Sequence, residues 1–176
     1  YSWLFQTARL SGLEEAALPM AKNYLNRSQT DETTEGRARR VQILGLAVTG
    51  KMEEALQGYE RELRGARIRS PNTTIDFALE LASKAQLADN FAASRSAIEK
   101  LSSAFFLNPY VRTLCENRLV RLELANQPAP KISLADFQGK SVDIAGYQGK
   151  LLLIDFWATN CRPCLEEFPA RETAVL

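Results

Sequence analysis

The chain has 176 residues, of which 45% are apolar and 24% are charged, proportions typical of a globular protein. Its 22 basic and 21 acidic residues nearly cancel, so the composition gives no reason to expect binding to nucleic acid or to an anionic membrane. No histidine is present, which excludes Ser-His-Asp and Cys-His catalysis and most zinc-ligand patterns. No apolar run approaches the roughly 18 residues of a membrane span.

Residues 1 to about 125 have the periodicity of α-helices. Apolar residues recur at spacings of three and four from Met52 to Leu63, and a second stripe runs from Phe91 to Phe105. Breaks in this pattern predict helix-hairpin turns about forty residues apart, which is the scale of a helical repeat. These predicted turns lie at residues 11–16, 49–55 and 88–94. Because one helix pair cannot bury its own apolar stripe, we expect the pairs to stack.

Two further signals place helices in this part of the chain. Ser70-Pro71 and Asn108-Pro109 each put a proline just inside a capping residue, which predicts a helix start. The sequence TGKMEEALQGYERELRG resembles the second half of a tetratricopeptide repeat, with Gly50 at the turn, Ala55 at the small packing position and Tyr59 one turn later. The other two copies keep less of that pattern, so a helical bundle of no named family is the alternative.

Two groups in the helical part are expected to be structural. Arg37, Arg39 and Arg40 form a basic cluster that predicts an ordinary solvated helix face. Cys115 shares an apolar stripe with Val111 and its neighbours, where a free cysteine behaves as a small core residue.

The pattern changes around NQPAP at residues 126–130. Two prolines in three residues cannot continue a helix and favour an extended linker. Beyond it, KISLADF alternates, glycines mark likely turns, and LLLIDFWA at 151–158 is a continuous apolar run. Such a run predicts a strand buried on both faces, as in a parallel sheet. We therefore expect a helical domain over 1–125, a linker over 126–130 and a second domain over 131–176.

Cys161 and Cys164 follow that predicted strand directly and open the predicted helix RPCLEEFPARETAVL. A cysteine at a helix start is exposed to free N–H groups and to the positive end of the helix dipole, which favour its thiolate. Cys164, three residues on, is close enough to resolve a mixed disulfide. Pro163 is tolerated in a first turn, and Arg162 adds a cation that favours the thiolate unless it points into solvent. A zinc half-site, a structural disulfide and a coincidental pair are the alternatives, and zinc lacks the further ligands it needs.

The segment GKLLLIDFWATNCRPCLEEFP resembles the active-site segment of the TlpA/ResA-like thiol-disulfide oxidoreductases of the thioredoxin-like superfamily. The preceding ISLADFQGKSVDIAGYQGK is similar to that family's N-terminal β-hairpin, so the resemblance covers residues of about 128 to 176. It implies that Cys161 is the attacking nucleophile and Cys164 the resolving thiol, with no bound cofactor and a protein disulfide or dithiol as substrate. By the same resemblance Trp157 flanks the site, and Glu167 matches the acidic position of the first active-site helix.

The chain departs from the family at two points. Asn160 stands where the family usually has tryptophan before the first cysteine, which alters the expected substrate-facing surface. A thioredoxin-like fold needs roughly 100 residues, so we expect a truncated domain that does not turn over by itself. The expected fold class is thus α plus α/β: a helical-repeat array, then an incomplete thioredoxin-like domain of β-hairpin, central strand and first active-site helix. Family members often place an acid beneath the cysteines, which makes Asp155 a candidate proton relay.

These observations lead to one main prediction and two alternatives. The main prediction is a thiol-disulfide oxidoreductase whose helical module binds a partner or positions the redox domain. Disulfide exchange is typical of oxidising compartments, so we expect an extracytoplasmic location, periplasmic or membrane-tethered. The first alternative is a helical-repeat interaction scaffold with a degenerate redox domain. The second, a peroxidase-type relative, would need an isolated cysteine instead of a close pair.

Overall fold

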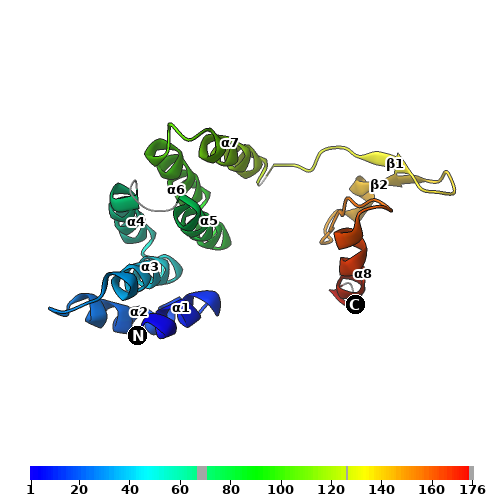
Figure 1. The fold of residues 1–176 in the computed structure, drawn as a ribbon. Helices are drawn as coiled ribbons and strands as arrows, with labels where there is room; N and C mark the ends of the chain where they lie inside the picture. The colour runs from blue at the N-terminus through cyan, green and yellow to red at the C-terminus, as the bar shows by residue number, and fades with distance from the viewer. Residues whose placement is uncertain (67–70, 126, 175–176) are drawn as a thin grey trace. The chain divides into compact units, whose positions relative to one another are not determined.

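The computed structural model describes residues 1–66, 71–125 and 127–174 (Figure 1). The chain divides into two compact units, Tyr1–Gln127 and Pro128–Leu176. No helix among the described residues has the length and apolar character needed to cross a bilayer.

The N-terminal unit consists of helices packed in succession, as Figure 1 shows. In the described residues these are α1 (Ser2–Leu10), α2 (Glu14–Leu25), α3 (Glu32–Val48), α4 (Met52–Ala66), α5 (Pro71–Leu87), α6 (Phe91–Ala104) and α7 (Pro109–Leu124). Each predicted turn joins two neighbouring helices: α1 to α2, α3 to α4, and α5 to α6. The positions of the three predicted hairpin turns are therefore confirmed, whereas their assignment to a tetratricopeptide-like repeat stays a prediction.

Backbone geometry explains why the chain turns at these places. Gly12 and Gly50 adopt φ of 67° and 81°, in the left-handed region that a glycine enters without steric penalty. At the third turn Asp89 has φ of 54°, and the side chain of the next residue, Asn90, accepts a hydrogen bond from Ala93 N–H at 3.0 Å. That cap satisfies one of the free donors at the start of α6.

The predicted start at Pro109 is confirmed. Pro109 is the first residue of α7, and the Asn108 side chain accepts a hydrogen bond from Val111 N–H at 3.2 Å. For the other predicted start, α5 begins at Pro71, whereas Ser70 lies outside the described residues.

Two apolar cores hold the helices together. The smaller core joins α1, α2 and the first half of α3 around Phe5 and Tyr24. The larger core extends from the second half of α3 to α7, and it contains the predicted stripe from Met52 to Leu63. Cys115 is buried in the larger core, as its place on an apolar stripe predicted.

The arginine cluster of α3 differs from its prediction. Arg37, Arg39 and Arg40 are each half-buried, and all three contact groups of the unit itself. Arg37 donates to the Ser2 hydroxyl, Arg39 pairs with Glu35, and the Arg40 guanidinium lies over the Phe77 ring. The prediction of an ordinary solvated face is therefore wrong, because Arg37 and Arg40 contact residues of α1 and α5, which are distant in sequence.

The C-terminal unit begins with a small antiparallel hairpin. Strand β1 (Ser133–Ala135) pairs with β2 (Ser141–Asp143), with Leu134 opposite Val142. The Asp136 carboxylate accepts from the N–H groups of Gln138 and Lys140, both at 2.9 Å, and so closes the turn between the strands. The predicted β-hairpin is confirmed. A 3₁₀ turn follows at Ile144–Tyr147, and the helix α8 (Arg162–Ala174) ends the described chain.

The predicted central strand at 151–158 is wrong for this chain. These residues have no regular secondary structure, and all of their side chains are exposed. A strand of a parallel sheet needs hydrogen-bonded neighbours at its edges and layers over its faces. The strands among the described residues are three residues long and pair with each other, so 151–158 has no sheet to join.

Candidate functional site

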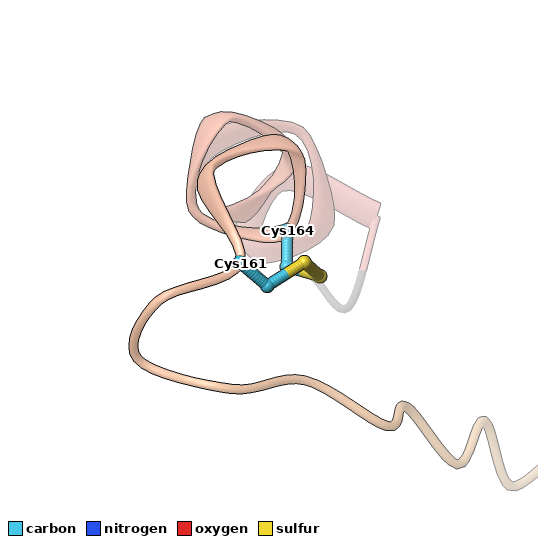
Figure 2. Close-up of a disulfide and its surroundings, with 2 residues drawn as sticks. All are labelled: Cys161 and Cys164. Atoms are coloured by element: carbon cyan, nitrogen blue, oxygen red, sulfur yellow. A yellow bond between two sulfur atoms is a disulfide. The ribbon is translucent and has the colours of Figure 1, made fainter.

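A disulfide joins Cys161 to Cys164 at the start of α8, with their Cα atoms 5.3 Å apart (Figure 2). Cys161 is the residue immediately before the helix, and Cys164 lies in its first turn. The Cys161 N–H donates to the Ala158 carbonyl at 3.0 Å, and the Cys161 carbonyl accepts from Leu165 N–H at 3.2 Å. These two bonds make a tight turn into the helix, which places the first cysteine at the helix N-terminus.

Both cysteines are partly exposed, as attack on a protein disulfide requires. The predicted site residues that lie in this first part of α8 are Arg162 and Pro163, both exposed. Pro163 lies in the first turn, where an amide hydrogen would have no helical acceptor. Arg162 Nε donates to Glu166 Oε1 at 2.8 Å, so its charge is paired with a carboxylate. Glu167 lies on an exposed part of the same helix.

On the other side of the cysteines, Trp157 and Asn160 lie in the segment that leads to the helix. Asn160 is exposed and is part of the turn before Cys161. The Trp157 ring meets Phe168 of α8 edge to face, with ring centroids 5.1 Å apart. Such contacts add about 0.5–1.5 kcal/mol beyond burial. The contact between Trp157 and Phe168 links the segment before Cys161, here called the approach segment, to α8.

Asp155 lies in the exposed segment and not in a buried strand, so its predicted position beneath the cysteines is wrong for this chain. Its role as a proton relay stays a prediction. Phe168 was missed by sequence reasoning, although a signal was present. It follows Cys164 by four residues, and helical residues at that spacing share a face.

Cys115, the third cysteine, differs from this pair in its electrostatic surroundings. Burial raises the pKa of the Cys115 thiol, and the nearby Glu116 carboxylate raises it further. Within the described parts of the chain, no three potential ligands of the His, Cys, Asp and Glu types gather into a metal site.

Comparisons with known proteins match only part of the chain. It is 44% identical over 46 residues to a thioredoxin-like protein, YneN, of Bacillus subtilis, and 42% identical over 41 residues to the thiol-disulfide oxidoreductase ResA of the same organism. It is 33% identical over 49 residues to ResA of Bacillus thuringiensis. These matches cover 23–28% of the chain and 23–28% of each relative.

The chain therefore spans about a quarter of the length of the curated relatives it matches. No family model matches, and neither does any solved structure. The partial matches support a thioredoxin-like relationship for the part of the chain that they cover.

Proposed function

We propose that residues 131–176 form the N-terminal part of a thioredoxin-like domain whose Cys161–Cys164 couple exchanges disulfides with partner proteins. Residues 1–125 form a helical-repeat module that binds a partner. The observation that carries the proposal is the disulfide across the first turn of α8, with the first cysteine at the helix N-terminus. The relatives named thiol-disulfide oxidoreductase support the same chemistry.

The reaction needs only the two thiols. In the reduced protein, the Cys161 thiolate attacks one sulfur of a substrate disulfide; a mixed disulfide forms and the second substrate sulfur leaves as a thiolate that takes up a proton. The Cys164 thiolate then attacks the Cys161 sulfur, so the mixed disulfide breaks and the Cys161–Cys164 bond forms. The substrate leaves as a dithiol with two electrons gained, and a protein dithiol of another redox partner reduces the couple again. Run backwards, the same steps oxidise a substrate.

Several residues around the cysteines have a place in this scheme. The free N–H groups at the start of α8 stabilise the thiolate of Cys161. Glu166 partly neutralises Arg162, and the contact between Trp157 and Phe168 holds the approach segment against the helix. Stable use of such a couple fits an oxidising compartment, and an extracytoplasmic location is part of the proposal.

Trapping the intermediate tests this function directly. In a Cys115→Ser background, we expect reduced Cys164→Ser protein to form a stable adduct with glutathione disulfide on Cys161, detected by mass spectrometry. The matched Cys161→Ser variant should form less adduct, because Cys164 lies inside the helix turn and not at its N-terminus. Equal adduct formation by the two variants would contradict the assigned roles.

Turnover is measured in the full-length protein with insulin as the disulfide substrate and dithiothreitol as the reductant. We expect Cys161→Ser to abolish insulin reduction, whereas Cys115→Ser should leave it unchanged. Insulin reduction that persists without Cys161 would favour the interaction scaffold over the oxidoreductase.

A further inference from the structure

A pocket of about 470 Å³ opens on the N-terminal unit between α1 and α3. This volume is within the roughly 300–1,000 Å³ typical of ligand sites. Among the described residues its lining comes mainly from two helices: Gln6, Arg9 and Leu10 of α1, and Gly36, Arg37 and Arg40 of α3.

The charge of this pocket comes from arginines that the fold holds in place. Arg37 donates to the Ser2 hydroxyl at 2.8 Å and to the Ser2 carbonyl at 3.3 Å. Both acceptors are neutral, so these contacts orient the guanidinium without cancelling its charge. Arg40 is held over the Phe77 ring, with its guanidinium carbon 5.2 Å from the ring centroid. Arg9 pairs with Glu80.

Two carboxylates, Glu32 and Glu62, also line the pocket and limit what it can accept. They repel a ligand with many negative charges, but they leave Arg37 able to bind a single one. Leu10 at the rim is 78% exposed and offers an apolar contact next to that charge. The lining therefore suits one carboxylate beside an apolar group.

Gly36 leaves open space on the α3 wall of this pocket. A glycine inside a helix destabilises it by about 1 kcal/mol relative to alanine, and close packing is one reason for a glycine there. Gly45 and Gly58 have one in the fold itself, since an added Cβ would come within 2.9 Å of the Glu14 carbonyl or of Ile43. A Cβ at Gly36 would meet nothing within 4 Å, although Gly36 lines the pocket. No packing in the described structure fills this space, so a ligand can approach α3 closely at Gly36.

We propose that this pocket binds a peptide segment of a partner protein that carries one carboxylate side chain between apolar residues. Arg37 holds the carboxylate, Leu10 contacts an apolar neighbour, and Gly36 lets the segment lie close to α3. The choice of a peptide over a small free acid rests on the proposed function, because disulfide exchange with proteins brings polypeptide segments to this chain.

Binding is measured with an immobilised library of amidated heptapeptides with a central glutamate, and with the same library carrying a central glutamine. The 176-residue chain carries Cys161→Ser and Cys164→Ser, so no disulfide exchange contributes and a failure here leaves the redox proposal standing. We expect about tenfold greater retention on the glutamate library, as one charge-assisted hydrogen bond provides. Arg37→Gln should remove that preference, and the matched Arg112→Gln on α7 should keep it.

Gly36→Ala separates binding from folding. We expect it to raise the thermal stability of the helical unit and to lower retention on the glutamate library, because its methyl group occupies the pocket. Equal retention on the two libraries, or an unchanged preference in Arg37→Gln, would overturn the proposal. Displacement of the peptides by an equal concentration of glutarate would also overturn it, in favour of a small acid ligand.

Discussion

Glu14 and Lys84 form a buried ion pair whose disruption can be predicted in detail. Glu14 is in the first turn of α2 and its side chain is 1% exposed, whereas the Lys84 side chain on α5 is 22% exposed. Lys84 Nζ lies 3.0 Å from Glu14 Oε1 without hydrogen-bond geometry, and among the described residues neither oxygen of the Glu14 carboxylate has a hydrogen-bond partner. The Lys84 charge is therefore the main contact that stabilises the buried carboxylate.

The difference in burial predicts an asymmetry between the two single variants. Lys84→Met leaves an uncompensated carboxylate in the core, which we expect to lower the free energy of unfolding by about 3 kcal/mol. Glu14→Gln leaves a lysine that can reach water, so we expect a smaller loss of about 1–2 kcal/mol. The double variant should lose clearly less than the sum of the two, because neither charge is then left alone.

Urea unfolding followed by the helical circular dichroism signal measures these losses. With a slope of about 1.5 kcal/mol per molar urea, a loss of 3 kcal/mol moves the midpoint down by about 2 M. Glu15→Gln is the matched control, since Glu15 is in the same helical turn but is exposed, and it should shift the midpoint little. If Lys84→Met costs no more than Glu14→Gln, or if the losses simply add, the carboxylate does not depend on Lys84 and the reasoning is refuted.

Two further predictions concern the larger core and the helix α7. After reduction, we expect Cys161 and Cys164 to react quickly with iodoacetamide at pH 8, while Cys115 reacts slowly until urea unfolds the chain. Because burial raises the pKa of Cys115, its thiolate fraction in the folded protein is small at this pH and rises only at higher pH; rapid labelling of three thiols in the folded chain would contradict this. Asn108→Ala should lower the free energy of unfolding by about 1 kcal/mol through loss of the cap on α7, whereas Asn117→Ala, at an exposed position inside the same helix, should be neutral or slightly stabilising. Equal urea midpoints for these two variants would show that the cap contributes nothing.

Features set by neighbours in sequence could be predicted from the sequence. The turns at Gly12 and Gly50, the cap at Asn108, the hairpin and the helix after Cys161 each depend on a few adjacent residues. Each depends on a residue type that the sequence shows directly: a glycine that can adopt a left-handed conformation, a capping side chain, or a proline in a first turn.

Contacts between distant residues could not be predicted in the same way. Glu14 meets Lys84 across 70 positions, and Arg37 reaches Ser2 across 35. Charged residues on a helix predict a solvated face on average. The packing of α1 and α2 against their neighbours is what buries Glu14 and holds Arg37 against Ser2. The pocket between α1 and α3 is formed by that packing, so no local sequence pattern predicted it.

The prediction of a strand at 151–158 is wrong for a related reason, which also bears on the redox site. Its run of apolar side chains indicates burial but does not indicate what covers them, and in the part of the chain that the structure describes β1 and β2 pair only with each other. The turn that holds Cys161 needs no such cover, because its bonds run from Ala158 to Leu165 and the disulfide closes within four residues. The geometry of the couple is thus local, whereas a substrate-binding surface depends on a sheet. It follows that the reactivity of Cys161 can be measured on these 176 residues.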